Sequence, residues 1–360
     1  MTVQKDMIRM LQELSDAPGA CGFEDEVIAV ARKWAAPIGP MEEDFLRNLY
    51  IRRKENTGAK PILMIDAHAD EVGFMIQYIK PDGTLRFLPL GSWNKASLVG
   101  TKVRVRNALG QYIPGIIAAK PVHHMSAAEK ANPSLDIEQM VIDVGAVSME
   151  DAVENFHIRI AEPVVPDVNF RYDQAHGLFF GKAFDCRIGC AAMLEALRRL
   201  EGVELPCDVV AVLSTQEEMG LRSARVTAHR VSPHIGIVMA GCPADDTFGE
   251  SYTVQTALKK GPMFRHMDVS AINSPRLQRF ALDLAKEKDI PVQEAVRKGG
   301  GNNSAAIQTT DRGAPAIVCG VPVRYCHSPN CISSEFDLEM SVQMVMALLT
   351  TISAEHIRAF

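Results

Sequence analysis

The sequence predicts an α/β fold interrupted by a small β domain, and three observations carry this prediction. Two helix-like segments joined by a Pro-Gly turn occupy residues 5–35. Short β-type runs punctuated by turns fill residues 71–165, a spacing typical of a small barrel or sandwich. After Gly181, helical and strand patterns alternate. We therefore expect one discontinuous α/β domain, residues 1–70 and 166–360, with a β insert between its two parts.

Individual elements follow from the spacing of apolar residues. Apolar residues at helical spacing after Asp185 predict a helix that begins there, and Ser334 with Asp337 three residues later predicts the start of the last helix. Apolar, β-rich runs predict strands at residues 62–65, 74–79, 98–105, 111–117, 209–213, 316–319 and 321–323.

The paired carboxylates of Glu217 and Glu218 are the most informative feature of the chain. They follow almost directly on the apolar run at residues 209–213, so they end a buried strand. Mutual repulsion and partial desolvation both disfavour ionisation of neighbouring acids. The pair therefore indicates either a bound cation or a role in proton transfer.

Further ligand-type residues stand at equivalent places. The strand at residues 62–65 leads to His68 and Asp70, so that Asp70 could orient the ring of a metal-binding His68. Asp185 stands at a helix start, and His327 follows the strand at residues 316–323. In open α/β sheets, ligands bind at the edge where such strands end.

Each of these residues also has an ordinary structural interpretation. A single His is usually a hydrogen-bonded structural residue, adjacent Glu residues often begin a solvated helix, and Asp185 could be an N-cap. The set as a whole favours a metal site. Its oxygen and nitrogen donors suit Zn, Co or Mn, and one bridging carboxylate can hold two ions roughly 3.5–4 Å apart.

Nearly the whole chain resembles the cytosolic metallo-aminopeptidases that assemble as hollow tetrahedral particles. That family includes glutamyl, leucyl and lysyl types and was once mislabelled as endoglucanases. The motifs that carry the resemblance are residues 17–25, 68–73, 120–123, 142–146, 182–185, 216–220 and 324–328. It implies a metallo-exopeptidase α/β/α sandwich with an inserted small β-barrel that serves assembly and substrate access.

The resemblance also implies roles for single residues. Asp185 would bridge two metals, Glu218 and His327 would complete one site, and His68 would belong to the other. Glu217 would be the general base. We place Asp70 in the catalytic set through its effect on His68.

Several positions depart from the family pattern. Ala240 stands where the second site normally takes an Asp, Cys186 replaces a second Asp after Asp185, and Gly301-Asn302-Asn303 replaces Gly-Thr-Asp. The site that uses His68 thus lacks a ligand. Cys242 lies two residues beyond Ala240, on the same face if the strand continues, and is a candidate substitute. Asp245 and Asp246 are further candidates.

For several other residues that could bind a ligand, the sequence pattern favours a structural role. His123 and His124 lie in the insert, away from the strand-end cluster, and indicate an interface or structural function. Cys186 and Cys190 lie four apart on one helix face, a pattern that favours packing. The glycines at residues 299–301 lack the spacing of a phosphate loop.

Composition agrees with an intracellular enzyme. With 360 residues and 47% hydrophobic content, the chain can bury one large core and a second small one. A net charge of −6 without a basic stripe argues against nucleic acid as a partner. The sequence shows no apolar stretch of membrane-spanning length and no export signal. Eight cysteines without a CxxC pair indicate reduced thiols, so we expect a cytoplasmic protein.

These features and the family resemblance together predict an aminopeptidase that removes N-terminal residues from short peptides. The resemblance further implies a homo-oligomer, such as a tetrahedral dodecamer. One or two ions per chain, Zn or Co, would activate a bound water whose proton Glu217 accepts. Two alternatives stay open. One is a hydrolase of another amide on the same fold, and the other is a catalytically weak paralogue with an incomplete second metal site.

Overall fold

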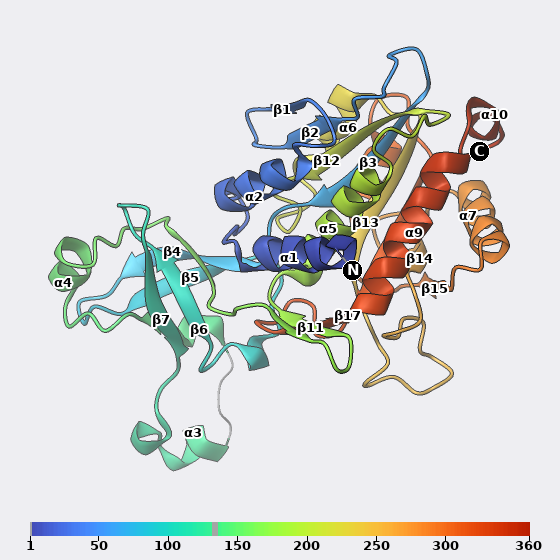
Figure 1. Cartoon of the computed structure of the whole chain (residues 1–360). Helices are drawn as coiled ribbons and strands as arrows, with labels where there is room; N and C mark the ends of the chain where they lie inside the picture. Colours follow the sequence, from blue (N-terminus) through green and yellow to red (C-terminus); the bar gives the residue numbers. More distant parts are fainter. Residues whose placement is uncertain (1, 132–135) are drawn as a thin grey trace.

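The computed structural model describes residues 2–131 and 136–360 (Figure 1). A mixed sheet runs through its centre in the order β1-β2-β12-β3-β13-β16-β14-β15. Its strands are β1 (Met41–Glu43), β2 (Leu49–Arg52), β3 (Ile62–His68), β12 (Asp208–Ser214), β13 (Ile235–Pro243), β14 (Met263–Met267), β15 (Gln293–Val296) and β16 (Ala316–Val323). The central strands β12, β3, β13 and β16 are parallel, so their carboxyl ends meet at one edge.

Helices cover both faces of this sheet. They are α1 (Thr2–Asp16), α2 (Asp25–Ala35), α5 (Phe184–Arg199), α6 (Ala224–Val231), α7 (Pro275–Glu287), α8 (Ser304–Thr309), α9 (Glu335–Thr351) and α10 (Ala354–Ala359). Helices α1, α5 and α9 pack together, and α6 packs with α8. On β13, Met239 lies against Gly189 of α5, whereas Gly236 lies against Ile307 of α8. Residues of opposite parity on a strand face opposite sides, so the predicted α/β/α sandwich is confirmed.

Between the layers lies one large apolar core. Strand β12 is buried along its whole length, as expected for a parallel strand covered on both faces. The core unites this strand with residues from the helices on either side. A separate, smaller core fills the barrel, in agreement with the two cores that the composition allows.

The inserted β segment forms a closed barrel in the order β4-β5-β8-β7-β6-β9 (Figure 1). Its strands are β4 (Gly73–Ile79), β5 (Leu85–Leu90), β6 (Lys102–Arg106), β7 (Tyr112–Ala118), β8 (Val141–Asp143) and β9 (Pro163–Pro166), and the short helices α3 (Ala127–Ala131) and α4 (Met149–Glu154) project from it. The strand expected at residues 98–105 begins only at Lys102, because Gly100 has a φ of 86° and turns the chain just before it. A separate assembly role for residues 71–165 stays a prediction.

A small antiparallel sheet of β10 (Arg171–Asp173), β11 (Leu178–Gly181) and β17 (Cys331–Ser334) leads into α5 and α9. The helix start predicted at Ser334 is confirmed, since the Ser334 hydroxyl accepts the backbone N–H of Asp337. That helix, α9, is not the last one, because the short helix α10 follows it. Among the described residues we find no helix with the length and apolar character needed to cross a membrane.

Candidate metal centre and active site

Polar side chains from the ends of the parallel strands line one cavity of about 630 Å³. His68 is the last residue of β3, Glu217 and Glu218 follow β12, and His327 follows β16. Asp185 joins them from the start of α5, where its own backbone is not yet helical, with φ −85° and ψ 103°. The five residues that the sequence singled out as a cluster therefore lie together in the structure.

Asp185, Glu218 and His327 form the first group of ligand atoms, which all lie within 4.8 Å of one another. Nε2 of His327 is 3.5 Å from Oδ2 of Asp185 and 3.6 Å from Oε1 of Glu218. The other ring nitrogen, Nδ1, lies 2.7 Å from the Ser92 carbonyl oxygen. That oxygen can only accept, so Nδ1 donates to it, and Nε2 is the ring nitrogen left to face the acids and, after loss of its proton, to bind a metal.

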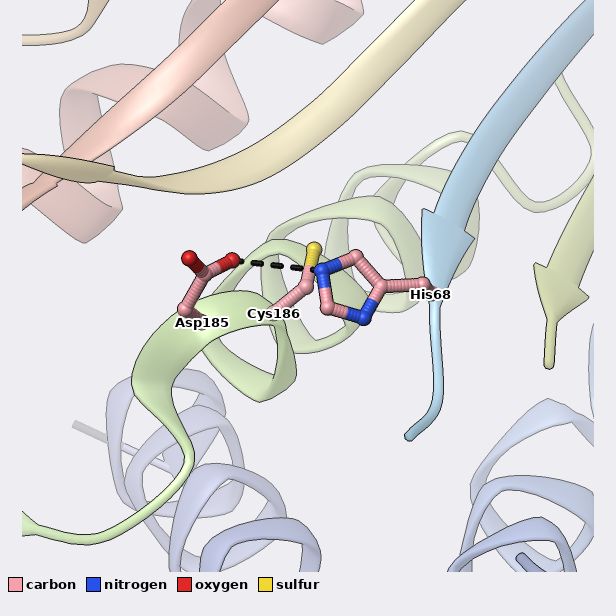
Figure 2. A group of neighbouring side chains, drawn as sticks. All are labelled: His68, Asp185 and Cys186. Carbon is pink, nitrogen blue, oxygen red and sulfur yellow. Dashed lines mark hydrogen bonds and ion pairs between the residues drawn. The ribbon is translucent and has the colours of Figure 1, made fainter. Parts of the chain in front are cut away.

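His68 approaches Asp185 from the other side (Figure 2). Its Nε2 lies 3.2 Å from Oδ1 of Asp185, whereas His327 faces Oδ2. Its Nδ1 lies 3.2 Å from the carbonyl oxygen of Asp70 and 3.4 Å from the Asp70 carboxylate. Asp70 thus orients the ring as the sequence suggested, and the two imidazoles flank one carboxylate.

Protonation within the site reflects its burial and its excess of acids. Burial, together with the charges of Asp185 and Asp70, raises the pKa of Glu217 to about 7. Burial also raises the pKa of Glu218 well above its ordinary value. Burial alone would lower the pKa of His327, but Asp185 and Glu218 outweigh it and raise that pKa to about 9. Such a set of buried carboxylates favours binding of a cation.

Two buried acids hold the Glu217–Glu218 turn in place. Asp70 accepts the backbone N–H of Glu217 on one oxygen and that of Glu218 on the other, each at 3.0 Å. Glu24 accepts the N–H of Gln216 at 3.1 Å. Asp70 therefore positions the backbone of both glutamates as well as the ring of His68. Sequence reasoning assigned no role to Glu24, although it lies in the motif at residues 17–25.

Backbone conformations beside the site are unusual for residues with a Cβ. Ala183, Gln216 and His327 have φ values of 57°, 56° and 58°, in the left-handed region. Each adjoins or is a candidate site residue, and such conformations persist only where surrounding contacts hold them. Gly241 has a different reason to be glycine: a Cβ there would lie 2.4 Å from the Phe184 carbonyl oxygen, so β13 could not pass so close to Asp185.

Beneath the site lies a buried ion network that sequence reasoning missed. Lys182 Nζ lies 2.6 and 2.8 Å from the two carboxylate oxygens of Glu71, and Arg187 Nη2 lies 3.5 Å from the nearer one. All three side chains are at most 1% exposed. Glu71 also accepts the N–H of Gly19. The network ties the residues after His68 to both sides of Asp185. In the sequence, the only indication of this network is that Glu71 and Lys182 lie in two of the motifs that carry the family resemblance, residues 68–73 and 182–185.

The structure does not bring Cys242 to the candidate metal ligands. Strand β13 continues to Pro243 as the prediction required, and Ala240 lines the cavity. The Cys242 thiol, however, belongs to none of the ligand groups found among the described residues. It accepts a 3.5 Å hydrogen bond from Arg265 and fills the space left by Gly320, where a Cβ would lie 1.9 Å from the sulfur.

The two neighbouring acids are also engaged elsewhere. Asp245 pairs with Arg297 at 2.5 Å, and Asp246 pairs with Arg324 at 2.7 Å. These ion pairs explain why neither Asp245 nor Asp246 joins the ligand groups. Asn303, which stands where the family has an Asp, donates to Asp66 and Ser214.

Of the remaining cysteines and histidines considered from the sequence, only Cys186 lies among the candidate ligands. Cys190 packs as expected and donates to the His68 carbonyl oxygen at 3.2 Å. Cys186, which we expected only to pack, instead forms a group with His68 and Asp185 whose ligand atoms lie within 4.8 Å (Figure 2). His123 and His124 are exposed in the insert, far along the chain from the strand ends.

Comparison with known proteins supplies the family. A sequence profile described as M42 glutamyl aminopeptidase matches residues 48–344. The chain belongs to the M42 family. It is 31% identical over 351 residues to the lysyl aminopeptidase of Pyrococcus furiosus, with 94% of this chain and 96% of that protein covered.

Solved structures agree with this assignment. A TET aminopeptidase from a marine sediment archaeon of the Thaumarchaeota superposes with a TM-score of 0.94 at 33% identity, covering 98% of this chain and 99% of the other. The TET1 peptidase of Pyrococcus horikoshii, which can assemble into a tetrahedron or a large octahedral shell, gives 0.85 at 28% identity, with coverages of 96% and 100%. The M42 chain is thus a metal-dependent aminopeptidase, and a hydrolase of another amide is not favoured.

Proposed function

We propose that this M42 aminopeptidase uses Asp185, Glu218 and His327 to hold a catalytic divalent ion, with Glu217 as general base and His68 beside it. The observation that carries the proposal is that His68 faces one oxygen of Asp185 and His327 the other, with Glu218 beside His327. Carboxylate oxygens and imidazole nitrogens are the donors that Zn and Co accept in such sites.

The chemistry of the reaction divides between the ion and the chain. When bound, the ion would lower the pKa of water and polarise the scissile carbonyl. Glu217 accepts the proton of the attacking water and delivers it to the leaving amine. Its Oε2 lies 3.9 Å from Nε2 of His68, so the carboxylate lies beside the proposed ligands. Asp70 holds Glu217 through the backbone N–H and does not engage its carboxylate.

Metal removal tests this function. We expect chelation to abolish release of N-terminal residues from short peptides, and addition of Zn or Co to restore it, because Asp185, Glu218 and His327 alone supply no electrophile. Peptide cleavage followed by mass spectrometry measures the loss and recovery. Full activity in protein shown by elemental analysis to be free of metal would contradict the proposal.

The finer question is which N-terminal residue is preferred, and we propose an acidic one. Besides the candidate ligands, the cavity is lined by three basic residues, Arg265, Arg297 and Lys298. Arg265 pairs with Asp268, and Arg297 pairs with Asp245. For the exposed Lys298 we find no ion pair among the described residues. Its charge is therefore available to a substrate carboxylate.

Lys298→Gln should lower kcat/KM for a substrate beginning with Glu about tenfold, with little effect on one beginning with Leu, because a charge-assisted hydrogen bond is lost. Initial rates on matched Glu, Leu and Lys aminoacyl substrates measure the preference. Lys288→Gln is the control, since that exposed lysine pairs with Glu287 and does not line the cavity. Faster cleavage of Lys than of Glu substrates by the wild type would contradict an acidic preference.

We also propose that the chain works as a homo-oligomer, such as a tetrahedral dodecamer, in the cytoplasm. Supporting this, large apolar side chains of the barrel and its flanking turns are strongly exposed, including Tyr78, Leu109, Val147 and Ile160 at 61, 61, 83 and 64%. Exposed apolar patches typically mark interfaces. Light scattering should give a particle of many subunits, and a monomeric mass would contradict this part of the proposal.

A further inference from the structure

The His68 side of the site has too few ligands if only the expected residues are counted. His68 Nε2 faces Oδ1 of Asp185, while His327 faces the other oxygen and lies beside Glu218. Ala240 and Gly241 line the cavity but offer no side-chain donor. Zinc sites normally have three or four protein ligands, or three and a water, so a second ion needs at least one more.

Cys186 lies where that ligand is missing (Figure 2). Its sulfur, the ring nitrogen of His68 and a carboxylate oxygen of Asp185 all lie within 4.8 Å of one another. Zn–S and Zn–N bonds in a tetrahedral site separate sulfur from nitrogen by about 3.5 Å. An approach of roughly an ångström would therefore suffice to close the group around an ion.

The position of the thiol is set by its surroundings. Sγ of Cys186 donates to the carbonyl oxygen of Met239 at 3.0 Å, next to Ala240 on β13. Gly189, one turn along α5, makes room for it, since a Cβ there would lie 2.8 Å from the sulfur. The sulfur is thus held between α5 and the part of β13 that lacks a ligand.

We propose that Cys186 is a ligand of a second metal ion, which it binds as a thiolate together with His68 and Asp185. The proposal rests on the proposed function, because Asp185 would be shared with the first ion. On binding, a metal–sulfur bond replaces the S–H bond, the proton passes to solvent, and Met239 loses its donor. A sulfur ligand selects Zn or Co over Mg, Ca and Mn, which prefer oxygen.

Cobalt provides a direct test, because thiolate coordination to Co²⁺ gives a charge-transfer absorption that oxygen and nitrogen ligands do not. The metal-free full-length protein is titrated with Co²⁺, and both the near-ultraviolet spectrum and the bound cobalt after dialysis are measured. Wild type should bind two ions and show the band with one of them. Cys186→Ser, which nearly keeps the side-chain size, should lose the band and lower the affinity for one of the two ions about 100-fold or more.

Two further variants separate the possible outcomes. Cys242→Ala, a buried thiol outside every ligand group, should keep both the band and the second ion. Asp185→Asn should lose binding of both ions. A single cobalt without the band in wild type, a band that persists in Cys186→Ser, or one that disappears in Cys242→Ala would overturn the role of Cys186 while leaving the first site intact. Undiminished cobalt in Asp185→Asn would overturn the proposed function itself.

Discussion

Glu217→Gln should lower turnover by about two to four orders of magnitude without loss of bound metal. Glutamine keeps the shape of the side chain but cannot accept the proton of the attacking water. The backbone of residue 217 would stay in place, because Asp70 holds it through the N–H and not through the side chain. Steady-state kinetics and elemental analysis on the same preparation measure both effects.

The neighbouring acid provides a matched control. Glu218→Gln should lower metal content first and activity as a consequence, since Glu218 belongs to the group with Asp185 and His327. Excess metal should then restore part of its activity, but none of that of Glu217→Gln. If Glu217→Gln kept near wild-type turnover, or if metal rescued it, the roles of the two acids would have to be exchanged.

Lys182→Met should lower the free energy of unfolding by about 3–5 kcal/mol, because it leaves the carboxylate of Glu71 buried without its closest cation. Arg187 lies farther from that carboxylate, at 3.5 Å, and so offsets only part of the loss. Urea unfolding followed by circular dichroism measures the change. Since the network joins the chain after His68 to the start of α5, metal affinity should fall as well.

An exposed ion pair provides the control for the buried network. Lys54 pairs with Glu201 at 3.1 Å with both side chains about half exposed. Lys54→Met should change stability by about 0–1 kcal/mol, since water already solvates both charges. Equal effects of Lys182→Met and Lys54→Met would show that the buried network does not hold the site together.

Much of the site could be predicted because its residues follow buried strands. His68, Glu217, Glu218 and His327 each come at or shortly after the end of an apolar run, and those runs belong to the four parallel strands at the centre of the sheet. Parallel strands bring their carboxyl ends to one edge, so proximity in space follows from position in the pattern. The α/β layers and the barrel were predictable for the same reason, since apolar periodicity reports which face is buried.

The roles of the cysteines depended on packing that no periodicity encodes. Cys242 has the right strand and the right parity to replace a ligand at Ala240, yet its thiol fills the gap at Gly320 on the neighbouring strand. Cys186 resembled a packing residue on a helix, yet the close contact of α5 with β13 brings its sulfur to His68 and Asp185. Both outcomes depend on a missing side chain, at Gly320 on the neighbouring strand for Cys242 and at Gly189 within the same helix for Cys186.

The sequence by itself thus determined the family, the layers and the edge where the polar residues gather, because these depend on which residues are buried and in what order. Only the tertiary structure decided which donors reach each oxygen of Asp185 and which buried charges support them. Ligand geometry depends on distances of an ångström between elements far apart in the chain. Those distances are set by close packing, in which the absence of a single Cβ redirects a neighbouring side chain.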